Sequence, residues 1–274
     1  MYDILAHCSN YERRANNQRV AAQLAHALHG NLTGIFVSEA VLPLPALGMP
    51  PMFPEILEVA AEVVASAQAA GPAFRSWAKE MGLSDARWQV AVGHLPSVLA
   101  AAANWHDLIV LESAIKAPWS SAGALGQVLL TCGAPCLLVP DAFTGNALAK
   151  TIAIASNDTA ESIRAIHAAL PILRRAERVI LLEAARPGAY SAIDWRPPLD
   201  LDAYLDRHDL RVIRRTIDVA DAAVGAELLK AAWETGAELL VMGAYGRTRF
   251  SEWALGGATR HVLEHSTIPV FLRH

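Results

Sequence analysis

Residues 237–246 read Ala-Glu-Leu-Leu-Val-Met-Gly-Ala-Tyr-Gly. The first six of them form an apolar, strand-like run, which ends in a loop containing Gly243 and Gly246. After nine intervening residues come Gly256 and Gly257, at the start of a helix-like segment. Glycines let a backbone approach a ligand closely because no Cβ intervenes, and phosphates bind where such a loop meets a helix N-terminus. The spacing supports a phosphate site and a plain strand end with tight helix packing about equally.

The composition is that of a globular chain without a strong charge. The chain has 274 residues, enough for one large domain or two average ones, and 53% of them are hydrophobic, so a sizeable core can form. A formal net charge of −4 argues against a general binder of nucleic acid or membrane surfaces. We see no signal peptide, no apolar stretch of membrane-spanning length and too few cysteines for a disulfide framework. We therefore expect a cytoplasmic protein without nucleic-acid or membrane partners.

The two halves of the chain repeat the same order of segments. Strand-like runs at 2–8, 31–37, 107–111 and 134–139 are matched in order by runs at 151–155, 178–183, 238–242 and 268–272. Such self-similarity indicates a tandem duplication. The join lies among small residues near 141–150, so we expect domains at 1–141 and 150–274.

Strand-like runs alternate with helical patterns in each half. This alternation is typical of βαβ units, and the continuous apolar runs at 108–111 and 239–242 favour a parallel sheet buried on both faces. A long alanine-rich helical pattern covers 56–79, with a kink expected at Gly71-Pro72. The fold class predicted from the pattern is α/β.

With these motifs the chain resembles the universal stress protein family, and in particular its tandem-domain members. The family pattern is Gly, two residues, Gly, nine residues, then Gly followed by Ser or Thr, and residues 243–257 follow it up to the last position. The usual family ending is present as Val262-Leu263-Glu264-His265 and Pro269-Val270. The resemblance implies two tandem doubly wound parallel-sheet domains of the adenine nucleotide α-hydrolase-like, Rossmann-like type. It also implies that they pack as a pseudo-dimer through the last strands, 136–139 and 270–272.

The resemblance further implies a nucleotide in the second half. Many members of the family bind ATP at the strand ends, with the glycine loop on the triphosphate and an acidic or amide residue near the nucleoside. Carried over residue by residue, this gives a candidate cofactor-binding set of Ala155, Asn157, Gly243, Gly246, Arg247, Gly256, Gly257 and Thr259. The chain departs from the family at Gly257, which keeps the backbone amide but lacks the usual hydroxyl, and Thr259 supplies a hydroxyl two residues later. The expected cofactor is ATP, with or without Mg²⁺.

The first half departs further from the family pattern. Aligning Pro135 with Pro269 places Glu112 opposite Gly243, and the loop that follows must be shorter. A carboxylate at the mouth of an anion site repels phosphate, and Ser9 or Asn10 stands where the family has an acidic residue. We expect the first half to have lost the triphosphate loop, and either to bind another small molecule or to act only as a packing partner.

Three further groups have ordinary explanations that we prefer. His261 and His265 share a helix face, as a metal pair would, but are more typical of structural or surface histidines. Cys132 and Cys136 are expected to be buried thiols rather than a redox pair. Asp158, followed by Thr159, suits the N-cap of the next helix better than a magnesium site. No metal site and no catalytic residue are expected.

The sequence thus favours a stress-response protein that binds an ATP-like nucleotide in its C-terminal domain and acts through ligand-dependent partner contacts. It shows neither a Walker lysine motif nor a Gly-x-Ser-x-Gly motif. Two alternatives remain open: a structural or interaction protein that binds no nucleotide, and a slow nucleotide hydrolase. A homodimer formed in addition to the pseudo-dimer is also left open.

Overall fold

A computed structural model of the chain describes residues 2–39, 54–113, 122–157, 159–184, 199–217, 224–244 and 257–274. Its strands and helices alternate along the chain, as the hydrophobic pattern predicts. The fold class is therefore α/β. No helix among these residues is long and apolar enough to cross a membrane.

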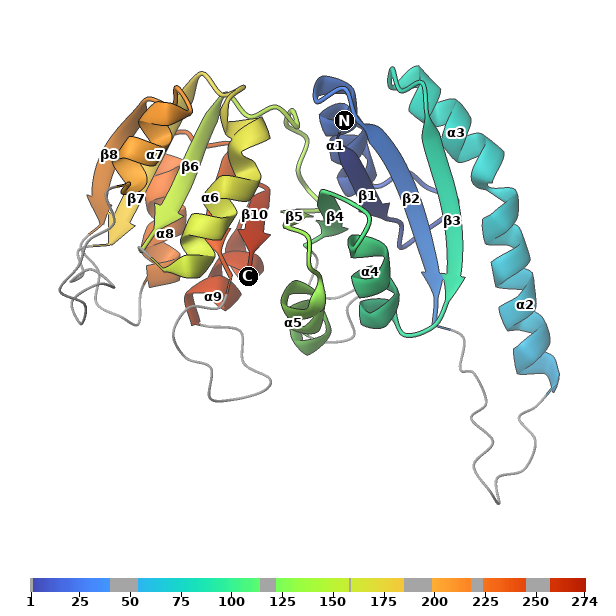
Figure 1. The fold of residues 1–274 in the computed structure, drawn as a ribbon. Helices are drawn as coiled ribbons and strands as arrows, with labels where there is room; N and C mark the ends of the chain where they lie inside the picture. Colours follow the sequence, from blue (N-terminus) through green and yellow to red (C-terminus); the bar gives the residue numbers. More distant parts are fainter. Residues whose placement is uncertain are drawn as a thin grey trace.

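The strands of the described residues form one ten-stranded sheet, in the order β3-β2-β1-β4-β5-β10-β9-β6-β7-β8. Each half contributes five parallel strands with the same internal order, so the duplication in the sequence is a duplication in the fold. Figure 1 shows the first half in blue to green beside the second half in yellow to red. The strands are β1 (Asp3–His7), β2 (Asn31–Ser38), β3 (Ala86–Val92), β4 (Leu108–Glu112), β5 (Cys136–Val139), β6 (Thr151–Ser156), β7 (Arg178–Ala184), β8 (Val212–Ile217), β9 (Leu239–Gly243) and β10 (Val270–Arg273).

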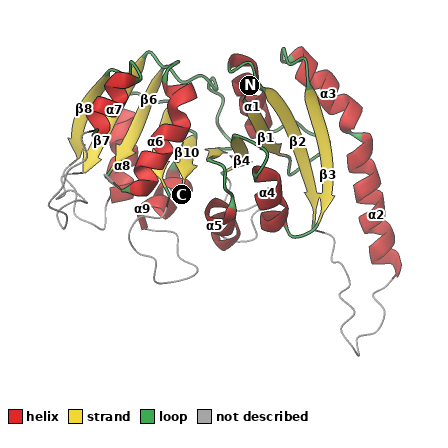
Figure 2. Ribbon diagram, in the orientation of Figure 1, coloured by secondary structure: helices red, strands yellow, loops and turns green. Residues whose placement is uncertain are grey.

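Helices cover both faces of this sheet (Figure 2). One face packs against α1, α3, α6 and α7, and the other against α4, α5, α8 and α9, so each half is doubly wound. Both hydrophobic clusters contain residues from the two halves, and each is therefore continuous across the molecule. The helices are α1 (Asn16–Ala27), α2 (Pro54–Ala69), α3 (Gly71–Glu80), α4 (Leu95–Ala103), α5 (Ala122–Thr131), α6 (Ala160–Leu173), α7 (Leu201–Arg207), α8 (Val224–Glu234) and α9 (Gly257–His265).

The two halves are joined by one antiparallel pair of strands. β10 pairs with β5, with Val270 opposite Leu138 and Leu272 opposite Cys136. This is the edge that the family resemblance implied, and it produces the expected pseudo-dimer. Because the pair is antiparallel, the carboxyl end of β10 lies beside the amino end of β5.

The helical pattern at 56–79 divides where the sequence indicates. α2 ends at Ala69 and α3 begins at Gly71, with Pro72 in its first turn, where a missing backbone N–H is tolerated. The third strand of each half, β3 and β8, was implied only by the family resemblance. In β3 exposed residues alternate with less exposed ones over much of the strand, since it lies at the sheet edge, and its apolar signal is correspondingly weak.

Candidate functional site

The candidate site of the second half lies at the carboxyl ends of β6 and β9. These two strands are neighbours in the sheet. The strand that follows β6 in the chain, β7, lies on one side of the pair, and the strand that follows β9, β10, lies on the other. Such a reversal of strand order is where doubly wound sheets bind ligands. The connections also place the N-termini of α6 and α9 at this edge, on opposite faces. Both helix ends present partly positive backbone amides, which suit an anion.

Gly243 ends β9 directly beneath the first turn of α6. A Cβ at this position would lie 2.6 Å from the Ser162 backbone nitrogen and 2.7 Å from the Glu161 carbonyl carbon. The absence of a side chain therefore lets the helix end approach the strand end. This glycine is explained by packing, whether or not a phosphate binds beside it.

Gly257 has the opposite environment. It is exposed at the first position of α9, and an added Cβ would have no heavy atom of the described residues within 4 Å, apart from its own helix backbone and chain neighbours. The structure therefore leaves room for the Ser or Thr of the family pattern. Two residues later, Thr259 is buried, with 5% of its surface exposed, so its hydroxyl lies within the protein rather than in solvent.

Asn157 and Ala155 flank the end of β6. Ala155 is half-buried and pairs with Met242 of β9. Asn157 is exposed, and its Oδ1 accepts a 2.8 Å hydrogen bond from the hydroxyl of Thr159. The side-chain NH₂ of Asn157 can act as a hydrogen-bond donor. The structure thus brings Ala155, Asn157 and Gly243 to the same edge of the sheet as Gly257.

Three members of the candidate set, Gly246, Arg247 and Gly256, lie outside the described residues, as does Asp158. The N-cap of α6 is Thr159, whose hydroxyl accepts from the Ser162 backbone N–H at 3.4 Å. The capping role preferred for Asp158 therefore belongs to its neighbour.

Ser156 also lies at this edge, although the sequence pattern did not single it out as a site residue. This residue ends β6 with only 6% of its surface exposed, and its hydroxyl has no hydrogen-bond partner among the described residues. Buried polar groups are nearly always paired, so an unpaired hydroxyl at a strand end calls for a water or a ligand group. The signal in the sequence was a serine closing an apolar strand just before Asn157.

The same edge of the first half is organised differently. Glu112 ends β4 at the position equivalent to Gly243, and Ser9 donates to its two carboxylate oxygens at 2.8 and 3.0 Å. Burial raises the pKa of Glu112, which the Ser9 hydrogen bond partly offsets. Burial also lowers the pKa of His7 to about 4, so this histidine is neutral at physiological pH.

The remaining groups have structural environments. Cys132 and Cys136 are buried free thiols, 7% and 1% exposed, as expected. His261 and His265 stack with ring centroids 4.2 Å apart, and His265 Nδ1 lies 2.9 Å from the His261 carbonyl oxygen. Within the described ranges no three His, Cys, Asp or Glu side chains are grouped as metal ligands would be.

The sheet order and the strand edge formed by β6 and β9 are those of a tandem doubly wound α/β protein. Residues 148–273 match the family model described as "Universal stress protein family". The second half of the chain, residues 148–273, is therefore a domain of the universal stress protein family.

Solved structures extend the likeness in fold to the whole chain. A universal stress protein from Archaeoglobus fulgidus superposes with a TM-score of 0.70 at 16% identity, over 99% of this chain and 95% of that one. A protein described as a putative universal stress protein from Pseudomonas aeruginosa gives a TM-score of 0.62 at 14% identity, over 100% and 93%. Curated proteins gave no match to the chain. The full-length matches agree with the tandem arrangement.

Proposed function

We propose that the second half binds an adenine nucleotide, and that this chain is a stress-response protein whose partner contacts depend on that ligand. The observation that carries the proposal is the edge formed by β6 and β9. The N-termini of α6 and α9 lie at this edge on opposite faces of the sheet, together with Asn157 and a Ser156 hydroxyl that bonds none of the described residues.

In this proposal different residues contact the phosphates and the nucleoside. Gly243, Gly246, Gly256 and Gly257 approach the phosphates through their backbone, and Arg247 adds a cation. The nucleoside lies against Ala155 and Asn157, because an amide both donates and accepts hydrogen bonds. The expected ligand is ATP, and Mg²⁺ would neutralise part of the triphosphate charge.

The first half has no equivalent role in the proposal. Glu112 occupies the position of Gly243, and its buried carboxyl group is already bonded to Ser9. A triphosphate would meet a carboxylate there in place of a glycine. We therefore assign the boundaries 1–141 and 150–274 to a packing domain and a nucleotide domain.

Equilibrium dialysis against ATP, with and without Mg²⁺, tests the proposal. We expect one nucleotide per chain, lost in Gly246→Glu, which brings a negative charge into the glycine loop. Gln127→Glu is the control, since it adds the same charge at an exposed position of α5. Absence of binding at millimolar ATP, or equal binding by both variants, would overturn the proposal. Phosphate release above background would instead support a slow hydrolase.

A further inference from the structure

The duplication creates two equivalent grooves, one on each side of the β5–β10 pair. The first groove lies beside α1, and the second lies beside α6. Four buried residues of α1 correspond, with an offset of 145, to buried residues of α6: Asn17, Val20, Ala21 and Leu24 to Ser162, Ala165, Ile166 and Ala169. Arg19 of the first groove is therefore equivalent to Arg164 of the second.

The first groove is filled by the segment that connects the halves. Asn16 donates its side-chain amide to the Asp141 carbonyl. Arg19 donates to the carbonyl oxygens of Phe143 at 3.1 Å and Gly145 at 2.9 Å. Phe143 is buried, with 8% of its surface exposed. This groove thus holds the connecting peptide, which turns at Pro140–Phe143, has two carbonyl oxygens bound by an arginine and has its aromatic ring covered.

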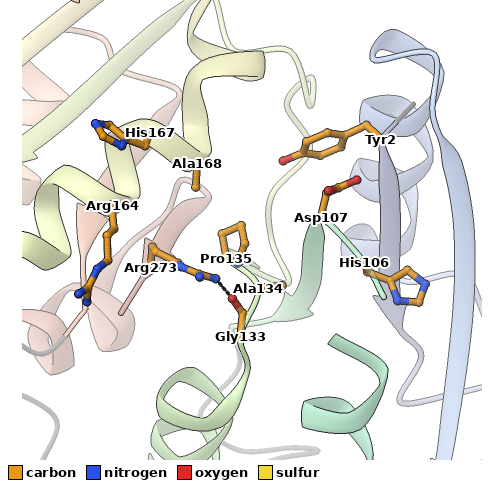
Figure 3. Close-up of a pocket in the computed structure, with 10 residues that line it drawn as sticks. All are labelled: Tyr2, His106, Asp107, Gly133, Ala134, Pro135, Arg164, His167, Ala168 and Arg273. Atoms are coloured by element: carbon orange, nitrogen blue, oxygen red, sulfur yellow. Dashed lines mark hydrogen bonds between the residues drawn. The ribbon is translucent and has the colours of Figure 1, made fainter. Parts of the chain in front are cut away.

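The second groove is open and forms a pocket of about 500 Å³, within the range of small-molecule sites. In Figure 3, Arg164, Ala168 and Arg273 line one wall, Pro135 lies in the middle, and Tyr2 and Asp107 line the other wall. The Tyr2 ring and Pro135 supply apolar surface. Burial and the nearby Asp107 raise the pKa of Tyr2, so its phenol stays protonated and can donate.

The charges of the pocket are arranged asymmetrically. Arg164 is exposed, and no acidic side chain of the described residues forms an ion pair with it. Arg273 donates to the Gly133 carbonyl oxygen, which aligns its guanidinium along the pocket (Figure 3). On the opposite wall Asp107 accepts a 2.8 Å hydrogen bond from the Asp3 backbone N–H. Arg164 and Arg273 therefore line one side of the pocket and Asp107 the other, with His167 beside the arginines and His106 beside Asp107.

We propose that this pocket binds a small acylated amino acid, a ligand with the chemistry of the segment that fills the first groove. Its carboxylate meets Arg164 and Arg273, because guanidinium groups pair well with carboxylates. Its amide N–H faces Asp107, and its side chain lies against Tyr2 and Pro135. The residue equivalent to Arg273 in the first groove is the apolar Val139. The second groove therefore has one more positive charge than the first, and this charge favours a carboxylate over an uncharged amide.

The site shares no residue with the proposed nucleotide site, although Arg273 pairs with Gly243 at the end of β9. It opens along the side of α6 that faces the β5–β10 pair, whereas Asn157 and Ser156 precede that helix and α9 begins on the other face of the sheet. Both sites can therefore be tested independently in the same protein.

Titration calorimetry with N-acetylphenylalanine on the full chain tests the inference, with N-acetylphenylalanine amide as the uncharged probe. We expect saturable millimolar binding or tighter, and at least fivefold weaker binding of the amide. Arg164→Gln and Arg273→Gln should each weaken binding of the acid at least fivefold. Arg87→Gln removes an exposed arginine of the edge strand β3 and should leave binding unchanged.

The inference is overturned if binding of the acid does not saturate at about 10 mM, on the order of weak-ligand affinities, or if acid and amide bind equally well. It is also overturned if Arg87→Gln weakens binding as much as Arg164→Gln does, or if ATP displaces the acid. Loss of fold does not confuse the outcome, because Arg164 is exposed and the melting temperature of its variant can be compared with that of Arg87→Gln.

Discussion

At the scale of single residues, two glycines of one motif have different physical roles. Gly243 lies where a helix end touches a strand end, so that even a methyl group would meet backbone atoms. Gly257 lies where an added Cβ would contact none of the described residues outside its own helix and its chain neighbours. The family pattern calls for a glycine at position 243 and for Ser or Thr at position 257, but the spacing carries no information on what surrounds either Cα.

This difference gives a paired prediction. Gly243→Ala should lower the free energy of unfolding by about 1–3 kcal/mol, because backbone atoms of α6 must move to make room. Gly257→Ala should leave stability unchanged or raise it by up to about 1 kcal/mol, since alanine favours a helix over glycine. Urea denaturation followed by circular dichroism measures both. Equal stability of the two variants would show that α6 does not press on Gly243.

Glu112 shows the same contrast between composition and environment. The alignment places a carboxylate opposite Gly243, and only the structure shows that Ser9 donates to both of its oxygens. The hydroxyl comes from a residue more than a hundred positions away in sequence, so no local pattern indicates the pair.

At the scale of elements, the two equivalent helices α1 and α6 begin differently. Thr159 caps α6 through its hydroxyl, which also donates to Asn157. The N-cap of α1 is Ala15, in extended backbone geometry and without a side-chain acceptor. Serine or threonine at such a position accepts a bond from an otherwise unpaired backbone N–H.

We therefore predict opposite effects at the two caps. Thr159→Ala should cost about 1 kcal/mol of unfolding free energy, and Ala15→Ser should contribute roughly 0.5–1 kcal/mol. Thermal melts of the two variants measured beside the wild type check this. A stabilising Thr159→Ala would contradict the capping role. In the proposed nucleotide site, Thr159→Ala should also free Asn157 Oδ1 and alter ATP affinity.

Most elements could be predicted from the sequence, because fully buried parallel strands such as Leu108–Leu111 have no polar residues. A kink was predicted at Gly71-Pro72, and the structure has the end of one helix and the start of the next there, with Pro72 in the first turn, where proline is tolerated. The cap of α6 was assigned one residue early, to Asp158 rather than Thr159. Both side chains suit a cap, and the choice depends on where the helix turns begin.

At the scale of the whole molecule, the two halves share their core. The clusters on both faces of the sheet run through the β5–β10 pair, where Phe271 is fully buried opposite Leu137. Domains joined only by a linker unfold independently, whereas a continuous core couples them.

We predict a single unfolding transition for the full chain. Phe271→Ala should lower the unfolding free energy by about 3–5 kcal/mol and move the transitions of both halves together. Differential scanning calorimetry shows whether there is one transition or two, and far-ultraviolet circular dichroism follows the loss of structure in the whole chain. Leu130→Ala, at an exposed position of α5, should have little effect. Two separate transitions, with only one shifted by Phe271→Ala, would contradict a shared core.

The sequence by itself determined the α/β class, the duplication and the family motif, because hydrophobic period and glycine spacing are written locally along the chain. Tertiary structure decided that Gly243 is a packing glycine, that Ser9 holds Glu112, and that one groove beside the central strands is filled while its equivalent is open. Those facts depend on which distant segments meet in space. The connecting segment can lie in only one of two equivalent grooves, and so one duplicated fold offers two different surfaces.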